Sequence, residues 1–451
     1  MRIKRITVKN LFGVFDHEVP MKMQDRITII HGPNGYGKTI LLTMLRDLFS
    51  SSYSNFYGIP FSELSLGFDD KSNLRLKKHI VGKSAERNTE NGRHELTVEF
   101  TKYRSKTPKS YTVKRRVAKR EALGFPLGLI EEEVPHLDRV GPETWIYLPT
   151  QERLSLEEVL NRFGERLPVR LIPEKLDEPD WFKEIKNMIN IRFIETQRLL
   201  SYPKTRRHRG YEGFSPLVPA VTNYSEELAN TIQAKLAEYA TLSQSFDRSF
   251  PLRLVKVSSS SELTIEELRT NLNQLEEKRS RLMAAGLLDK EKEIDIKELQ
   301  RIDEGNRNVL SVYIEDVKSK LSVLDELTNK IDLLVKIINS RFLHKQMSIS
   351  KKEGFTFKTS EGKDLLPIKL SSGEQHELVL LYELLFKVKP DSLILIDEPE
   401  LSLHVLWQQQ FLKDLEEITK IVGLDFLIAT HSPQIIHDRW DLTVELKGPS
   451  K

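Results

Sequence analysis

The amino-acid sequence predicts an α/β fold in which a β-rich N-terminal lobe is followed by an inserted hairpin of α-helices. Apolar residues alternate along residues 3–19, as in half-buried strands, and lead into a glycine-rich loop at 32–39. Between about residues 224 and 342 they follow heptad spacing, which indicates paired helices. After Gly354 short apolar runs return. The predicted domains are therefore an N-terminal lobe, a helical insertion and a C-terminal lobe, at residues 1–215, 216–345 and 346–451.

Length and composition limit the possible classes of protein. The 451 residues suggest two or three structural units, at roughly 100–200 residues per domain. No apolar run approaches the ~20 residues of a membrane-spanning helix, and the N-terminus lacks the apolar stretch of a secretory signal. Because cysteine is absent, disulfides, thiolate catalysis and zinc–thiolate sites are excluded. We expect a cytoplasmic protein whose bound metal, if any, is held by oxygen or imidazole.

Short strands are expected throughout the first lobe. Residues 27–30 form an apolar run that enters the glycine-rich loop, and residues 40–49 continue as a helix with leucines on one side. This is the order of strand, loop and helix that a phosphate site requires. Further strands are predicted at 96–100 and 111–113, around a basic turn. A helix is predicted at 154–163.

The helical insertion contains two apolar series with heptad spacing. The first includes Leu268, Leu272 and Leu275, and the second runs from Ile314 to Ile338. Each spans only about four to five heptads, so the helices are too short for a long arm. We expect a short antiparallel coiled-coil hairpin. Ordinary bundle helices remain the alternative.

The loop itself, GPNGYGKT at residues 32–39, matches the pattern G-x-x-x-x-G-K-[ST]. In such a loop the backbone N–H groups surround phosphate oxygens. Lys38 would reach the outer phosphates, and the Thr39 hydroxyl would ligate Mg²⁺. ATP and Mg²⁺ are therefore the predicted cofactors. The residues predicted to bind the nucleotide here are Asn34, Gly35, Gly37, Lys38 and Thr39.

Two adjacent carboxylates follow a second predicted strand. The segment SLILIDEPE, residues 392–400, contains four apolar residues typical of a buried parallel strand and then Asp397 and Glu398. Asp397 is placed to hold Mg²⁺ through a water, and Glu398 to act as the general base for the attacking water. An apolar run that ends in Asp-Glu is weak evidence alone. Together with the phosphate loop it is strong.

Residues 370–377, LSSGEQHE, precede an apolar helix. As a local sequence, Ser-Ser-Gly-Glu is a good helix N-cap with Glu374 in the first turn. The motif also resembles the LSGGQ signature of ABC-type ATPases, in the form used by SMC and RecF proteins, with serine for the first glycine and Glu374 for the glutamine. In that family the signature of one subunit contacts the γ-phosphate held by another. The resemblance therefore implies a composite site to which Ser371 and Gly373 contribute.

Two further residues match this family by position. IATHSP places His431 after a predicted buried strand, where the family's switch histidine contacts the γ-phosphate. IETQRL places Gln197 after another predicted strand, like the Q-loop glutamine that senses Mg²⁺ and the attacking water. In isolation His431 is typical of a structural histidine, and Gln197 of the start of an exposed loop. The resemblance makes Glu398, His431 and Gln197 the predicted catalytic residues, and Thr39, Asp397 and Gln197 the predicted residues around Mg²⁺.

Together these motifs resemble ABC-type P-loop ATPase heads of the SMC, RecF and OLD kind, and the stand-alone ATPases of antiphage systems such as PARIS and Septu. Segments 243–254 and 339–342 also look like that defence group, without an assigned chemistry. OLD nucleases continue into a Toprim domain, whereas this chain ends about twenty residues after His431. The resemblance therefore implies an ATPase that serves as sensor and scaffold for a separate effector, a nuclease or toxin, in antiphage defence.

Two other functions remain open. A RecF- or SMC-like DNA-repair ATPase would clamp DNA, and a nucleotide-bound structural assembly would hydrolyse ATP only incidentally. Because the formal net charge is only +3, any DNA contact has to come from local basic clusters, such as 102–120 and 204–209. Such clusters are also typical of solvated turns. The expected partners are further copies of this chain, as a homodimer of heads or a higher homo-oligomer, and the separate effector, with no membrane contact.

Overall fold

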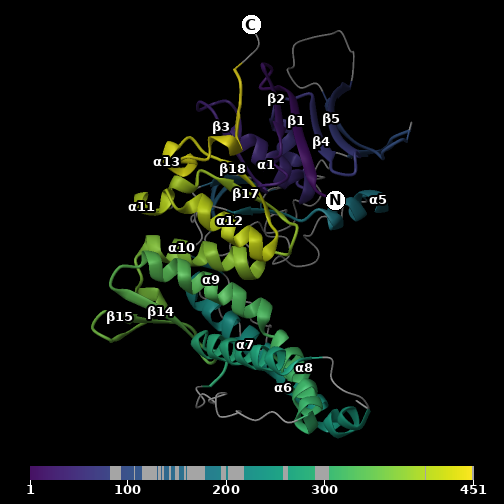
Figure 1. The fold of residues 1–451 in the computed structure, drawn as a ribbon. Coiled ribbons are helices and arrows are strands. Elements are labelled where there is room, and N and C mark those ends of the chain that lie inside the picture. The colour runs from purple at the N-terminus through teal and green to yellow at the C-terminus, as the bar shows by residue number, and fades with distance from the viewer. Residues whose placement is uncertain are drawn as a thin grey trace, which may run out of the picture. The chain divides into compact units, whose positions relative to one another are not determined.

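The computed structural model divides the chain into two compact units, shown in Figure 1. Unit 1 consists of Met1–Gln197 and Val388–Lys451, and unit 2 of Arg198–Lys387. Each unit is described by itself. The structure describes residues 1–81, 93–105, 107–113, 130, 134, 137–141, 144–147, 152–156, 159, 178–194, 200–201, 218–256, 263–289, 304–401 and 403–448.

An antiparallel sheet forms the N-terminal part of unit 1 and confirms the predicted β-rich lobe. The strand order is β2-β1-β4-β5-β6-β7. Buried and partly exposed residues alternate along β4, as expected for a sheet with one face on the core. The strands are β1 (Ile3–Leu11), β2 (Phe15–Pro20), β4 (Glu63–Phe68), β5 (Asn73–Val81), β6 (Arg93–Thr101) and β7 (Lys109–Val113).

A parallel sheet forms the second layer of unit 1, with strand order β11-β17-β18-β3-β19. In β18 every residue is buried, and in β3 and β17 all but the last, which explains their continuous apolar runs. Parallel strands end at the same edge, so the segments after β3, β18 and β17 are neighbours. The strands are β11 (Ile191–Ile194), β17 (Leu393–Asp397), β18 (Asp425–Ala429), β3 (Ile27–His31) and β19 (Thr443–Glu445).

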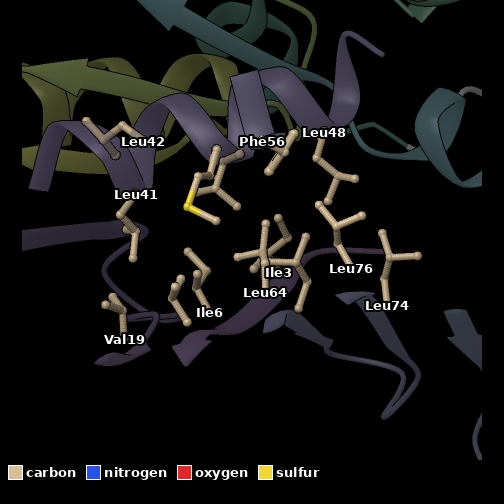
Figure 2. Packing of buried hydrophobic residues seen from close by; sticks show 14 of the residues in the cluster. Ile3, Ile6, Val19, Leu41, Leu42, Leu48, Phe56, Leu64, Leu74 and Leu76 are labelled. Atoms are coloured by element: carbon tan, nitrogen blue, oxygen red, sulfur yellow. The ribbon is translucent and has the colours of Figure 1, made fainter. Parts of the chain in front are cut away.

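Helix α1 (Lys38–Phe49) lies in the core of unit 1. Figure 2 shows the side chain of Leu41 on the side of α1 that faces Ile6 of β1 and Val19 of β2, and that of Leu42 on the other side of the helix. The same buried cluster includes Leu395 of the parallel sheet, so α1 packs against both sheets. Each fully buried leucine contributes roughly 1.5–3 kcal/mol. This packing fixes the start of α1, where the phosphate loop ends.

Residues 137–155, midway along the predicted first lobe in sequence, form a small antiparallel sheet with order β10-β9-β8. The helix predicted at 154–163 is wrong at its start, because Leu154 belongs to a strand and pairs with the buried Trp145. Residues 160–163 lie outside the described part of the chain. The strands are β8 (Leu137–Gly141), β9 (Thr144–Tyr147) and β10 (Glu152–Ser155). Unit 1 also contains the helices α2 (Ser54–Gly58) and α5 (Asp180–Met188).

Unit 2 confirms the helical insertion, with more helices than the predicted pair. Helices α7 (Ile265–Ala284) and α8 (Glu304–Ser322) pack against each other, and α6 (Ala220–Lys256) also packs on α8. The second heptad series is shared by α8 and α9 (Asp325–Arg341), because the chain turns between them. No helix within the described residues is long and apolar enough to cross a membrane.

The remaining part of unit 2 carries the predicted signature. A hairpin of β14 (Lys345–Ser350) and β15 (Gly354–Thr359) follows α9, and α10 (Ser372–Tyr382) comes after it. The other elements of the unit are β12 (Leu200–Ser201), β13 (Val218–Pro219), β16 (Asp364–Leu365), the short helix η4 (Pro367–Lys369) and the π-helix η5 (Glu383–Lys387).

The two segments without assigned chemistry have packing roles in unit 2. In segment 243–254, the Arg253 guanidinium forms an ion pair with Asp316 and joins α6 to α8. In segment 339–342, the Asn339 side chain donates to the backbone O of Met347 at 3.0 Å and accepts from its N–H at 2.7 Å. Both segments therefore hold helices in place.

Candidate nucleotide site

The phosphate loop connects β3 to α1, as its pattern predicts. Gly37 is the N-cap of α1 with φ 86°, and Gly35 has φ 87°. Side chains are strained in this left-handed region. A Cβ at Gly37 would also lie 2.6 Å from Leu11 Cδ2. Both predicted glycines therefore have a conformational reason, and Gly37 a steric one as well.

The N-terminus of α1 is suited to an anion. No side chain caps it, and its first turn contains no acidic residue. The first N–H groups of a helix lack intrahelical acceptors and form the positive end of its dipole. Asn34 and Gly35 of the loop are exposed, as is Thr39 at the second position of the helix. These donors fit phosphate oxygens.

Lys38 is the first residue of α1, and its side chain lies against the loop. The residue is only 5% exposed. Its Nζ donates to the backbone O of Gly32 at 2.7 Å and of Pro33 at 3.2 Å. These two bonds hold the ammonium group over the loop, where the pattern predicts contact with the outer phosphates.

Asp397 and Thr39 form one side of the site. The Thr39 hydroxyl lies near the Asp397 carboxylate. Burial raises the pKa of Asp397 above its usual range, and the nearby Glu398 and Glu400 carboxylates add to this, whereas the Thr39 hydroxyl and the Lys38 charge oppose it. Its Oδ1 is buried and has no hydrogen-bond partner among the described residues.

This arrangement fits a magnesium ion. A buried, unpaired carboxylate oxygen beside a threonine hydroxyl is what an incoming cation needs, and Mg²⁺ usually takes one or two protein ligands together with phosphate and water. Among the described residues, no group of three or more His, Asp or Glu side chains could hold a metal by itself.

Glu398 leaves the sheet where Asp397 ends it. Its N–H donates to the Ala429 O at 2.8 Å, and its backbone has φ 43°, which is uncommon for a non-glycine residue. The side chain is 29% exposed, and Oε1 lies 3.7 Å from Nδ1 of His431. The chain thus turns at Glu398, directly after the strand that ends at Asp397.

His431 follows the buried strand β18, as its place in the sequence predicts, and lies near the acidic residues. β18 lies between β3 and β17 in the sheet, and the N–H of Thr430 donates to the O of Ile30 at 3.2 Å. The His431 side chain is 49% exposed. The structure therefore gathers the phosphate loop, the acidic pair and His431 at one edge of the parallel sheet in unit 1.

Glu400 is a residue that sequence reasoning missed. Its Oε1 accepts from the Thr430 hydroxyl at 2.8 Å and from the His431 N–H at 3.2 Å, and it lies 3.3 Å from the His431 Nδ1. Only its place two residues after the acidic pair could have drawn attention to it. Nearby, Nδ1 of His404 accepts from the N–H of Leu406 and caps α11 (Val405–Gln408).

The predicted signature lies in unit 2, where its local role as a helix cap is confirmed. Ser371 is the N-cap of α10, and its side chain and that of Glu374 form a reciprocal capping box. The Nζ of Lys345 donates to both carboxylate oxygens of Glu374, at 2.8 and 2.6 Å. A Cβ at Gly373 would meet no atom within 4 Å. The contact with a second subunit's nucleotide stays a prediction.

Two predictions fall wholly or partly outside the described residues. Gln197 and the basic cluster 204–209 are not among them. Of the cluster 102–120, residues 102–105 and 107–113 are described, and Lys102, Arg104 and Lys109 are exposed there.

Helices and short turns after the acidic pair complete unit 1. The segment passes through η6 (Pro399–Leu401) and α11, and then through α12 (Phe411–Val422) to β18. Beyond His431 it continues through α13 (Pro433–Ile436) and η7 (Trp440–Leu442) to β19. β19 pairs in parallel with β3, so the C-terminal segment lies beside the strand that enters the phosphate loop.

Solved structures of SMC heads are similar to this chain at low identity. The SMC head domain from Thermotoga maritima has a TM-score of 0.32 and 11% identity, over 99% of this chain and 94% of that one. The Smc head from Pyrococcus furiosus, bound to the C-terminal domain of ScpA, has a TM-score of 0.31 and 11% identity, with the same coverage. Scores of this size add nothing to the fold derived above.

Sequence comparisons assign the family. The "Retron Ec83 probable ATPase" of Escherichia coli is 29% identical over a match of 181 residues that covers 34% of this chain and 32% of that protein. The match thus spans about a third of the relative's length. The family model described as an AAA ATPase domain matches residues 1–436, which include the phosphate loop, the acidic pair and His431. The chain therefore belongs to this family of P-loop ATPases.

Proposed function

We propose that this chain binds and hydrolyses ATP as an ABC-type ATPase and acts as the sensor and scaffold subunit that controls a separate nuclease or toxin in antiphage defence. The observation that carries the ATPase part is the gathering of Lys38, Asp397, Glu398 and His431 at one sheet edge. The defence part rests on the resemblance of the motifs to the ATPases of antiphage systems, and the partial similarity to the "Retron Ec83 probable ATPase" supports a related role.

In this proposal each residue has a separate task. The loop N–H groups and Lys38 bind the phosphates, and Thr39 and Asp397 hold Mg²⁺, which neutralises charge on the transferred phosphoryl group. Glu398 accepts a proton from the attacking water. His431 contacts the γ-phosphate, and Gln197 is proposed to contact Mg²⁺ and the water. Asp397 and Glu398 therefore divide metal binding and base catalysis between them.

The proposed site is completed by a second copy of the chain. Ser371 is exposed, and the space at the Gly373 Cα is open. The capping box occupies the N–H of Glu374 but leaves the earlier N–H groups of α10 for an outside acceptor. A γ-phosphate bound to the partner copy would be such an acceptor. Two heads would then enclose two nucleotides.

Mixing two inactive variants tests this arrangement. A Lys38→Ala chain and a Ser371→Arg chain should each lack ATPase activity, and a heterodimer of the two has one site with both lesions and one intact site. We expect part of the activity to return on mixing, measured as phosphate release per head. The controls are the two variants measured separately, each at the same total protein concentration as the mixture.

A sharper outcome comes from Glu398→Gln, which should bind ATP without hydrolysing it and so trap the closed dimer. Light scattering at saturating ATP should give the mass of a dimer or larger oligomer, and the Lys38→Ala/Glu398→Gln double variant should not. A strictly monomeric Glu398→Gln chain with ATP bound would contradict the composite site.

The scaffold role is tested by co-expression with the neighbouring gene product. Affinity capture of the wild-type chain should retain that product, and the retained amount should differ between Glu398→Gln with ATP and Lys38→Ala. If the same amount is captured in both nucleotide states, the chain is a structural partner whose binding does not depend on ATP. Absence of capture in every nucleotide state contradicts the scaffold role.

A second function, DNA clamping, is favoured by one specific feature. The turn between β6 and β7 exposes Lys102 and Arg104, and Lys109 at the start of β7 is exposed as well. The ring centroid of Tyr103 lies 5.0 Å from the Nζ of Lys71. If this turn contacts DNA phosphates, replacing each basic residue by alanine should reduce the slope of log K against log salt concentration by about one. Unchanged binding and salt dependence in the triple variant would remove this turn from any DNA interface.

A further inference from the structure

The carboxylate of Glu400 is almost fully buried beside His431. Its side chain is 9% exposed, and Oε1 is shared by the Thr430 hydroxyl and the backbone N–H of His431. The other oxygen, Oε2, is buried and has no hydrogen-bond partner within the described residues. A buried carboxylate needs such donors to remain charged.

The turn that carries Glu400 is fixed from both sides. The Nε2 of Gln408 donates to the backbone O of Glu400 at 3.3 Å, and the Ser432 hydroxyl lies 3.4 Å from the Oε1 of Gln408. The Leu401 N–H donates to the O of Glu398 at 3.1 Å. Glu400 is therefore bound to the segment after β18 through both its side chain and its backbone.

The imidazole of His431 has two carboxylates near Nδ1. Oε1 of Glu400 lies at 3.3 Å and Oε1 of Glu398 at 3.7 Å. The shorter distance lies just above the usual range of about 2.7–3.2 Å for an N–H···O hydrogen bond, and the longer one lies well outside it. A lone pair on Nδ1 would face negative charge from both acids, so the surrounding groups favour a hydrogen on Nδ1.

We propose that Glu400 is a positioning residue that accepts a hydrogen bond from Nδ1–H of His431 and so leaves Nε2 as the ring nitrogen available at the γ-phosphate. This proposal rests on the function proposed above for His431. Fixing one nitrogen of a histidine orients the ring and selects its tautomer. Glu398, at the longer distance, is left for the attacking water.

Substitutions at Glu400 separate orientation from nucleotide binding. Glu400→Ala removes the acceptor, and we expect ATPase kcat to fall about tenfold or more, with unchanged ATP affinity because Lys38 and the loop are intact. Glu400→Gln keeps an acceptor oxygen and should retain more activity than Glu400→Ala. Thr430→Val removes only the other side-chain donor to Glu400, so it should lower kcat less than Glu400→Ala.

A double-mutant cycle shows whether Glu400 acts through the histidine. In a His431→Ala background, Glu400→Ala should cause no further loss of kcat, because the residue that it positions is already absent. Additive losses would mean that Glu400 acts elsewhere, and would overturn the proposal. If His431→Ala leaves kcat unchanged, the role proposed for His431 fails.

The tautomer provides a test that does not depend on ATP turnover. In protein labelled with ¹⁵N-histidine, the His431 signals are identified by their loss in His431→Gln. Neutral His431 should carry its hydrogen on Nδ1 in the wild type and become a mixture of tautomers in Glu400→Ala. A wild-type ring with hydrogen on Nε2, or the same spectrum in both proteins, would overturn the proposal even if the ATPase assignment stands.

Discussion

The N-termini of α1 and α10 differ in the backbone conformation of the cap residue, which is left-handed at Gly37 and extended at Ser371, and in their chemistry. At α1, a glycine in the left-handed region begins the helix, no side chain caps it, and Lys38 is the first residue. At α10, the Ser371 hydroxyl accepts the Glu374 N–H, and Glu374 accepts the Ser371 N–H in return. The first helix keeps its donors for an external anion, whereas the second uses part of them within its own chain.

This difference shows that the backbone N–H groups at a helix N-terminus can serve an external anion, a capping side chain, or both. The phosphate loop requires a residue without a side chain at Gly37, because a Cβ there would lie 2.6 Å from Leu11 Cδ2. The signature is held by its own capping box and by Lys345, which pairs with Glu374. Binding at α1 therefore should not require a second subunit, whereas any phosphate contact at α10 should.

Lys38→Ala gives the largest expected effect. Charged hydrogen bonds contribute ~1.5–3 kcal/mol each, so the loss of the Lys38 ammonium should weaken ATP binding by about a hundredfold or more. Titration calorimetry on the variant measures this, with the melting temperature as the control for folding. Unchanged ATP affinity in a folded Lys38→Ala chain would show that the N-terminus of α1 is not the phosphate site.

Gly373→Ala tests the outward role of α10. Because the added methyl group meets no atom of the chain within 4 Å, we expect unchanged folding and unchanged ATP affinity of the single head. ATPase activity at high protein concentration should fall about tenfold, if the backbone there approaches a partner's phosphate closely. Full activity would show that α10 needs no open approach at this position.

Glu374→Ala addresses the inward role of α10 and should cost about 1 kcal/mol of unfolding free energy, the usual effect of losing a helix cap. Burial works toward a higher pKa for Glu374, but hydrogen bonds from Lys345 and Ser371 outweigh it, so the pKa is lowered. The stabilisation is therefore full above the unfolded value of about 4.5 and is lost as pH falls through the lower folded value.

Denaturant unfolding of the wild type and of Glu374→Ala at neutral pH and at about pH 3 checks this sign. The difference between the two proteins should shrink at the acidic pH. A constant difference would mean that the capping box owes nothing to the charge of Glu374.

The smallest effect is expected at His17, which supports the phosphate loop. His17 is 2% exposed, and its Nε2 lies 2.8 Å from the backbone O of Tyr36. Burial lowers its pKa, and its Nδ1 is buried with no hydrogen-bond partner in the described part of the chain. Stability should therefore be full above the unfolded value of about 6.5 and decrease as pH falls below it.

His17→Gln keeps an N–H donor for the Tyr36 carbonyl but does not titrate. Its unfolding free energy should decline less than that of the wild type between about pH 8 and pH 5.5. ATP affinity should be little changed at the higher pH. Equal pH dependence in both proteins would show that His17 does not limit stability in this range.

The sequence by itself determined the elements whose chemistry is local. GPNGYGKT specifies a left-handed start of α1 whatever surrounds it, and the apolar run before Asp397 specifies a buried strand that ends in two acids. Adjacent residues stay adjacent in every fold, so such motifs can be found without coordinates. The heptad series predicted helices, but it could not show that the second series breaks between α8 and α9.

Only the tertiary structure decided which distant residues meet. Leu154 is a strand residue because Trp145 offers it a partner in β9, against its helical pattern. β18 lies between β3 and β17, and this strand order brings His431 to the acidic pair. The hydrogen bond of Glu400 with Thr430 joins residues 30 positions apart. Strand order is set by the packing of whole sheets on α1, a property that no short segment of the chain contains.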